Sequence, residues 1–203
     1  MSMPVLIPAA GLSSRMRGTD KLLLEVDGRP LLRRQIEIAQ SVSADVCVAL
    51  PPAPHPRYEA VPDGVSVVAV PDAAKGMSAS VRALVTQVLD RASQAMILLA
   101  DLPALTAADL RAVLDAADAH PDALIWRGAT QDGAPGHPLV VSRKLFAEFQ
   151  ALRGDTGGAQ VAKAHRDRTH LVALPGNRAR LDLDTPEDWT AWRAGTQTHP
   201  PRA

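Results

Sequence analysis

Short apolar runs alternate with segments of helical period along almost the whole chain, and this alternation constrains the fold more than any other feature. Most of the runs are apolar throughout, as strands covered on both faces of a sheet would be. We expect strands at 4–7, 45–50, 65–70, 95–100, 123–126, 137–141 and 169–174. The alternation indicates a three-layer α/β/α fold with a mostly parallel sheet.

The segments between the runs carry the apolar periodicity of amphipathic helices. The clearest stripe begins at Met77 and recurs at Val81, Leu84 and Val88, a spacing typical of one helix face. Further helices are expected at 30–42, 142–152, 157–165 and 186–194, and one starts after Thr106 with a capping pattern that Asp109 completes. In such a sheet, ligands bind beyond the carboxyl ends of the strands.

Length and composition set the class of protein. The 203 residues suit one domain, which we expect at 1–194, with a disordered tail at 195–203. Residues 51–64 are rich in proline and are expected to form a stiff connection. The 22 Lys and Arg residues balance 22 Asp and Glu residues, which excludes the basic field that holds nucleic acid or an anionic membrane.

The single cysteine and the first residues indicate the compartment in which the protein is expected. One cysteine, Cys47, forms neither an internal disulfide nor a zinc cage, and its apolar surroundings predict a place in the strand core. The first residues lack the cationic region of a signal peptide, and no stretch has the roughly 20 apolar residues of a membrane helix. A cytoplasmic protein is expected.

The first expected strand leads directly into the stretch AAGLSSRMRGTDKLL at 9–23. Ala9, Ala10 and Gly11 leave the backbone bare, so its N–H groups can approach a ligand closely. Arg15 and Lys21 then add the positive charge that a polyphosphate needs. The stretch is interpreted as a phosphate-binding loop, and a tight turn with solvated cations is the alternative.

The loop matches neither of the common phosphate-binding motifs. A P-loop has four residues between its glycines and then Lys followed by Ser or Thr. Here six residues separate Gly11 from Gly18, and Lys21 precedes Leu22. A dinucleotide fingerprint is also absent from the sequence.

Two further segments supply carboxylates. Asp101 ends an apolar strand, where it is a natural ligand for Mg²⁺, although a cap or turn would also explain it. Asp182 and Asp184 share one side of an extended segment, and we prefer Asp184 as the metal ligand, with Asp182 in reserve. Glu187 and Asp188 follow at a helix start, where they favour the positive helix terminus and are left out of the site.

The motifs together resemble a known family. The quoted loop is followed by DGRPLLRRQ, GMSASVRA, LADLP, GAPGHPLV, GDTGGAQ and DLDTPEDW. This series resembles the cytidylyltransferases that attach CMP to molybdopterin, within the molybdenum-cofactor guanylyltransferase-like nucleotidyltransferases. The resemblance spans roughly residues 3–192. One departure is Arg17, which interrupts the usual Arg-Met-Gly and leaves Gly18 one place late.

The resemblance implies a nucleotide-diphospho-sugar-transferase-like domain that uses Mg²⁺ and CTP, with molybdopterin as acceptor and pyrophosphate as product. It implies catalytic roles for Arg15 and Lys21 and a metal site at Asp101 and Asp184. The implied nucleotide-binding residues are Ala9, Ala10, Gly11, Leu12, Arg15, Lys21, Gly76, Met77, Ser78 and Ser80. The implied acceptor side consists of Gly136, His137, Asp155 and Gly157.

The serines and histidines have alternatives to a site role. Ser78 and Ser80 lack the surroundings of a hydrolase nucleophile, and Ser78 is either a helix cap or a base contact. His137 either faces the acceptor or is a loop histidine whose hydrogen bonds are satisfied. The other five histidines lack metal-ligand spacing.

The sequence favours one nucleotide, whereas several acceptors are alternatives. A loop with AAG is more similar to the cytidine users and one with AGG to the guanine users of the molybdenum branch, so Ala10 favours CTP, its methyl group crowding a purine near the base pocket. Acceptor alternatives are a sugar phosphate or another small phosphorylated compound. A non-catalytic molybdenum-cofactor carrier is the alternative of a different class. A molybdenum hydroxylase or its maturation chaperone is a further expected partner.

Overall fold

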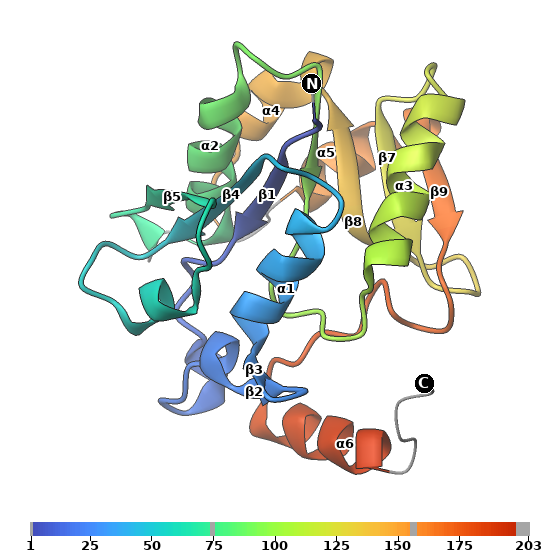
Figure 1. The fold of residues 1–203 in the computed structure, drawn as a ribbon. Helices are drawn as coiled ribbons and strands as arrows, with labels where there is room; N and C mark the ends of the chain where they lie inside the picture. The colour runs from blue at the N-terminus through green and yellow to red at the C-terminus, as the bar shows by residue number, and fades with distance from the viewer. Residues whose placement is uncertain (1, 74–75, 155–157, 198–203) are drawn as a thin grey trace.

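A seven-stranded sheet forms the centre of the molecule in the computed structural model, which describes residues 2–73, 76–154 and 158–197 (Figure 1). The strands lie in the order β5, β4, β1, β6, β8, β7, β9. Their bounds are β1 Val5–Pro8, β4 Val46–Leu50, β5 Ser66–Ala69, β6 Gln94–Ile97, β7 Ile125–Ala129, β8 Pro135–Ser142 and β9 Thr169–Ala173. A separate two-stranded hairpin pairs β2 Glu25–Val26 with β3 Arg29–Pro30.

The sheet is parallel except at β8. Strand β1 pairs in parallel with both β4 and β6, and β7 pairs in parallel with β9. Strand β8 runs antiparallel to both of its neighbours, with Leu139 opposite Ile97 of β6. The start of β8 therefore lies at the same edge of the sheet as the carboxyl ends of the parallel strands.

Helices cover both faces of the sheet (Figure 1). The helices are α1 Leu31–Gln40, α2 Met77–Val88, α3 Ala107–Ala119, α4 Phe146–Gln150, α5 Ala159–Ala164 and α6 Pro186–Gln197. Short 3₁₀ turns are η1 Ser14–Met16, η2 Lys21–Leu23, η3 Pro56–Ala60, η5 Arg143–Leu145 and η6 Arg166–Arg168. Side chains of α1 and α3 belong to one hydrophobic cluster, and those of α2, α4 and α5 belong to the other.

The two clusters explain why inner strands such as β1 and β4 are apolar throughout. In β1, Val5 and Ile7 face the cluster of α1 and α3, and Leu6 faces the cluster of α2. Because successive side chains of a strand alternate between the faces, a strand covered on both sides has no polar positions to offer. The three-layer, mostly parallel fold expected from the alternation is confirmed.

The described elements follow the predicted ones apart from small shifts of their ends and five larger differences. Strand β6 ends at Ile97, short of the expected residue 100, and β8 is antiparallel. The expected helix at 142–152 is the turn η5 followed by the short α4. The expected connection at 51–64 contains the turn η3, and the β2–β3 hairpin was missed because its strands have only two residues each.

Two local predictions are confirmed. Thr106 caps α3 through a capping box with Asp109, in which each side chain accepts a hydrogen bond from the other residue's backbone N–H. Cys47 is a buried residue of β4, and its burial raises the pKa of the thiol.

The end of the chain forms a helix that reaches into the expected tail. Helix α6 continues to Gln197, so residues 195–197 are helical, and residues 198–203 lie outside the described part. Trp189 anchors α6 in the cluster of α1 and α3. Among the described residues, no helix has the length and hydropathy needed to span a membrane.

Candidate active site

A cavity of about 570 Å³ opens beyond the carboxyl ends of β1 and β6, where the strand order predicts a ligand site. Its size is that of a small-molecule site. It is lined by Pro8, Ala9, Gly11, Leu12, Ser13, Ser14, Arg15, Lys21, Leu22, Ala73, Gly76, Met77, Ser80, Leu99, Ala100, Asp101, Asp182 and Asp184. The loop, helix and carboxylate motifs that are far apart in the sequence thus meet around one space.

The loop after β1 turns its backbone to this cavity. A Cβ added at Gly11 would meet no other protein atom within 4 Å, so the space beside this residue is open. Leu12 is 70% exposed at the cavity wall. The bare backbone therefore leaves room for a ligand, as the phosphate-loop interpretation requires.

Ala10 does not take the place expected of it. Its side chain is fully buried in the cluster of α2, and Ala10 does not line the cavity. The preceding residue, Ala9, still donates its N–H to Ala49 O over 3.0 Å, so the chain at this point keeps the alternation of a strand. The expectation that the Ala10 methyl group crowds a base pocket is wrong, because this methyl group points into the core.

The four charged residues predicted for the site form one cluster. Lys21 Nζ lies 2.6 Å from Asp101 Oδ2 and 2.5 Å from Asp184 Oδ1. Arg15 forms an ion pair with the other carboxylate oxygen of Asp184. Lys21, Asp101 and Asp184 are largely buried, whereas the Arg15 side chain is exposed. The cluster holds two positive and two negative charges.

The surroundings shift the pKa of Lys21 and of the neighbouring Asp182. Burial lowers the pKa of Lys21, but the paired carboxylates Asp101 and Asp184 together outweigh burial, so the net shift is upward. Desolvation raises the pKa of Asp182, and the negative charges of Asp184 and Asp101 add to this rise. Lys21 therefore stays charged, while the charged form of Asp182 is disfavoured.

The first turn of α6 holds Asp184 in place. The Asp188 carboxylate accepts the backbone N–H of Asp184 over 3.1 Å and that of Thr185 over 2.8 Å. Asp188 in turn donates its own N–H to Thr185 Oγ1. These bonds are those of a capping box. Hydrogen bonds from the Thr185 side chain and from the backbone N–H groups of Thr185 and Asp184 lower the pKa of the Asp188 carboxyl. Asp188 therefore serves the helix start, as the sequence indicated.

The start of α2 forms the opposite wall. Gly76 precedes the helix with a φ of 95°, a conformation that favours glycine, and Met77 and Ser80 line the cavity. Ser78 does not cap the helix, because α2 begins at Met77 after Gly76 and no side chain caps it. The Ser78 hydroxyl is buried without a hydrogen-bond partner among the described residues. Its alternative role as a base contact stays a prediction.

The carboxylates fit a divalent cation that is shared with a ligand. Asp101 Oδ1 is buried and has no hydrogen-bond partner among the described residues, although buried polar atoms are nearly always paired. No group of three or more potential ligand side chains gathers in the described part of the chain. Mg²⁺ is commonly held by one or two carboxylates together with substrate phosphates, and Asp101 with Asp184 provides such a pair.

Comparison with known proteins agrees with this geometry. Residues 5–169 match the MobA-like NTP transferase domain. The chain belongs to this family. It is 32% identical to a phosphoenolpyruvate guanylyltransferase of Sanguibacter keddieii over 135 residues, which cover 64% of this chain and 45% of that protein. The chain therefore matches slightly less than half the length of this relative.

Solved structures of the family are similar over nearly the whole chain. Rv0371c of Mycobacterium tuberculosis is 30% identical, with a TM-score of 0.81 over 95% of this chain and 97% of that one. A structure of Rv0371c in complex with manganese is 27% identical over 94% and 97% of the two chains, with a TM-score of 0.78. More distant nucleotidyltransferases share the nucleotide-diphospho-sugar transferase fold. The chain thus shares its fold with these nucleotidyltransferases.

Two of the residues expected on the acceptor side, Gly136 and His137, lie in the described part of the chain. A Cβ at Gly136 would come within 2.2 Å of Ala179 O, so glycine here permits the close approach of two chain segments. His137 Nδ1 has no hydrogen-bond partner among the described residues, and burial, followed by the nearby Arg127, lowers the pKa of His137 to about 3. Neither Gly136 nor His137 lines the cavity, and their role toward an acceptor stays a prediction.

Two expected residues cannot be placed. Asp155 and Gly157 lie outside the described residues. In contrast, Ala73 lines the cavity although no motif pointed to it, and Leu99 lines it although no role was expected for this first residue of the LADLP motif. Leu99 lies two residues beyond the end of β6 and two before Asp101, and this place is the signal from which it could have been predicted.

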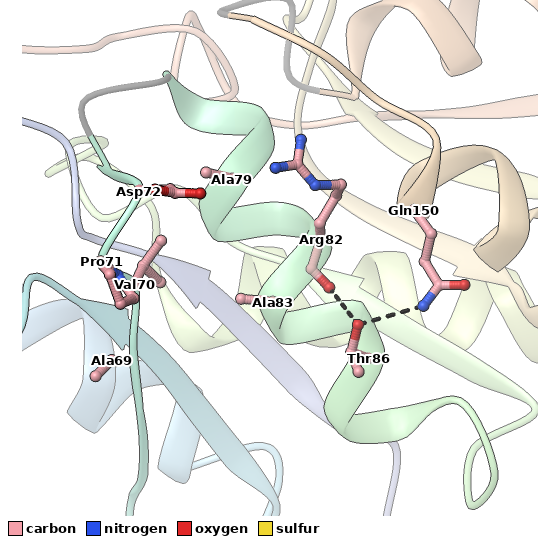
Figure 2. Close-up of a pocket in the computed structure, with 9 residues that line it drawn as sticks. All are labelled: Ala69, Val70, Pro71, Asp72, Ala79, Arg82, Ala83, Thr86 and Gln150. Carbon is pink, nitrogen blue, oxygen red and sulfur yellow. Dashed lines mark hydrogen bonds between the residues drawn. The ribbon is translucent and has the colours of Figure 1, made fainter.

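A second hollow lies on the outer side of α2 (Figure 2). It has a volume of about 440 Å³, and its wall includes Arg82, Thr86 and Gln150. Thr86 donates to Arg82 O and accepts from Gln150 Nε2, and Arg82 donates to Leu152 O. These three polar side chains bond to the protein itself, and the hollow is lined by none of the residues predicted for the site, so it is not the candidate active site.

Proposed function

We propose that this protein is a nucleotidyltransferase that transfers CMP from CTP to molybdopterin and uses Mg²⁺ as its divalent metal. The observation that carries the proposal is the cluster of Lys21, Arg15, Asp101 and Asp184 at one cavity. A protein that only carried the cofactor would have no need for this pair of metal-binding carboxylates. The intact cluster therefore favours an enzyme over a carrier.

The reaction joins two anions, so the residues act mainly by charge and alignment. An oxygen of the acceptor's terminal phosphate attacks the α-phosphorus of CTP, the bond from that phosphorus to the bridging oxygen breaks, and pyrophosphate leaves with the electron pair. Lys21 and Arg15 neutralise the phosphates, and the backbone at Gly11 lies beside them. Asp101 and Asp184 would hold the metal, which supplies positive charge to the phosphates.

The choice of CTP rests on the similarity of the AAG sequence to the cytidine users, because Ala10 offers no steric selection. The side chains available to a base at the cavity are Leu12, Met77 and Ser80. All three lie on flanking segments, and Met77 and Leu12 are exposed apolar groups that can pack against a base. We therefore assign base selection to these side chains.

A second candidate function has one observation in its favour. The relative from Sanguibacter keddieii is a phosphoenolpyruvate guanylyltransferase, whose name pairs a guanine nucleotide with a small phosphorylated acid. The corresponding activity here would use GTP and a small phosphorylated acceptor at the same charge cluster. It differs from the first candidate in both substrates.

One screen separates the candidates. Purified protein with Mg²⁺ or Mn²⁺ is given CTP, GTP, ATP or UTP together with molybdopterin, phosphoenolpyruvate or a sugar phosphate, and pyrophosphate release is measured. We expect release with CTP and molybdopterin. Release with GTP and phosphoenolpyruvate would select the second candidate, and release with no pair would overturn both.

The variant that tests the metal-binding role of Asp101 is Asp101→Asn. It removes one negative charge but keeps the size of the side chain, and the expected result is loss of most turnover with an unchanged circular dichroism spectrum. Near-normal turnover of the folded variant would contradict the metal-binding assignment of Asp101.

A further inference from the structure

Arg57 is a buried arginine whose guanidinium group faces the phosphate loop. It belongs to η3, inside the proline-rich segment, and its side chain is only 2% exposed. Arginine is almost never fully buried unless it is paired. Its partners therefore show what its burial achieves.

All three nitrogen atoms of the guanidinium group donate to the loop. Nε and Nη2 form a fork on Asp20, with distances of 2.7 Å to Oδ2 and 2.8 Å to Oδ1. Nη1 donates to Ala9 O over 2.6 Å, and Nη2 also donates to Ser13 Oγ over 3.3 Å. One side chain thus holds the beginning, the middle and the end of the loop that carries Arg15 and Lys21.

The contact with Asp20 leads directly to Lys21. Asp20 precedes Lys21 and caps η2, since its Oδ1 accepts the N–H of Leu22 over 3.1 Å. The carboxylate that binds Arg57 therefore also fixes the turn from which Lys21 extends to Asp101 and Asp184. A planar fork sets direction as well as distance, which a lysine at position 57 would not do.

The contact with Ser13 holds a strained part of the loop. Ser13 has a φ of 50°, in the left-handed region that residues other than glycine rarely adopt. Such a conformation persists only when the surroundings impose it. The hydroxyl of Ser13 is bonded to Arg57, and it also lies 3.5 Å from Asp20 Oδ1.

We infer that Arg57 is the positioning residue of the nucleotide site. It orders the loop at 9–21 and, through Asp20, aims Lys21 at the phosphates of a nucleoside triphosphate. Arg57 does not line the cavity, so it acts through the loop and makes no contact of its own with the ligand. The inference rests on the proposed function for the identity of the ligand, and on the hydrogen bonds alone for the order of the loop.

The test uses two conservative variants, Arg57→Lys and Asp20→Asn. Binding of CTP with Mn²⁺ is measured by calorimetry, and kcat and KM by pyrophosphate release. We expect binding to weaken at least about tenfold and kcat/KM to fall about 100-fold, since small misplacements at a reacting centre have effects of this size. Both substitutions break the same chain of hydrogen bonds from Arg57 through Asp20. The double variant should therefore lose little more kcat/KM than the more impaired of the two single variants.

Two controls separate positioning from simple loss of stability. Arg91→Lys breaks a similar arginine fork, on Asp45, at residues that do not line the cavity. Val113→Ala opens a gap in the buried core at α3 and lowers the melting temperature. Both controls should keep CTP binding within about twofold of the wild type.

Hydrogen exchange gives a readout that needs no nucleotide. In Arg57→Lys and Asp20→Asn, the amide of Leu22 should exchange at least about tenfold faster, while amides of β1 and β4 keep their wild-type rates. If the wild type binds neither CTP nor GTP, the proposed function fails, and exchange still decides the role of Arg57. If loop exchange and CTP binding are unchanged in both variants, Arg57 has only a structural role and the inference is overturned.

Discussion

Lys21 Nζ donates to Asp184 Oδ1 over 2.5 Å, although 163 positions separate the two residues in the sequence. The bond joins the loop after the first strand to the segment before the last helix. Since Asp101 and Arg15 complete the cluster, removing one charge leaves a largely buried partner without its counterpart. The predictions below use this dependence.

Replacing Lys21 by alanine should lower kcat by about 10²–10³, the effect of losing one preorganised electrostatic group. The two carboxylates keep their places in the segments after β6 and before α6, so the fold should persist. Pyrophosphate release under saturating substrate is the measurement. A change limited to a few-fold in KM would identify Lys21 as a cation without a catalytic role.

The raised pKa of Lys21 predicts how stability depends on alkaline pH. A lysine whose pKa is higher in the folded than in the unfolded chain contributes stability that is complete below about pH 10.4, its unfolded value, and is lost as the pH rises through the folded value. Urea unfolding of the wild type and of Lys21→Met should therefore give a constant difference in unfolding free energy from pH 7 to 9, and a shrinking one above about pH 10.4. A difference that stays constant to pH 12 would contradict the shift.

Asp184 and Asp182 provide a matched pair, because both line the cavity but only Asp184 is bonded to Lys21 and Arg15. Asp184→Asn should abolish most turnover and weaken binding of Mn²⁺ with CTP. Asp182→Asn should retain turnover within about tenfold of the wild type, since the surroundings disfavour the charge of the Asp182 carboxylate. The reverse order of effects would transfer the metal site to Asp182.

Ala10→Gly tests whether the AAG sequence selects the base by size. Because the methyl group is buried in the core, its loss should destabilise the fold by about 1–2 kcal/mol, from the lost burial and the greater freedom of glycine in the unfolded chain. The ratio of kcat/KM for CTP and GTP should stay within about threefold of the wild-type ratio. A larger shift in that ratio would show that the loop backbone at Ala10 influences the base pocket.

Much of the fold could be predicted because inner strands such as β1 and β4 are buried on both faces and therefore carry continuous apolar runs. The direction of β8 could not be predicted, since a buried strand has the same composition in either direction. The β2–β3 hairpin was missed because pairs of two residues leave no periodicity to detect.

The charged part of the site could be predicted because Lys21, Asp101 and Asp184 lie at positions where the fold brings the ends of elements together. Arg57 could not be predicted, because a charged residue among prolines resembles a solvated loop residue and only the folded chain shows its burial. The prediction that Ala10 lies at the base pocket was wrong for a related reason. Whether a small side chain faces a ligand or the core depends on where the strand alternation ends, which the sequence leaves undecided.

The capping box at the start of α6 holds a site residue, Asp184, that the ribosome makes late in synthesis. The backbone of Asp184 is held by Asp188, and Trp189 fixes the helix to the core. A ribosome makes all of the sheet strands before it makes this helix, so the growing chain can form the sheet while Lys21 still lacks one of its two partners. We therefore expect the nascent chain to bind metal and nucleotide only after the sheet has formed and the last helix has left the ribosome.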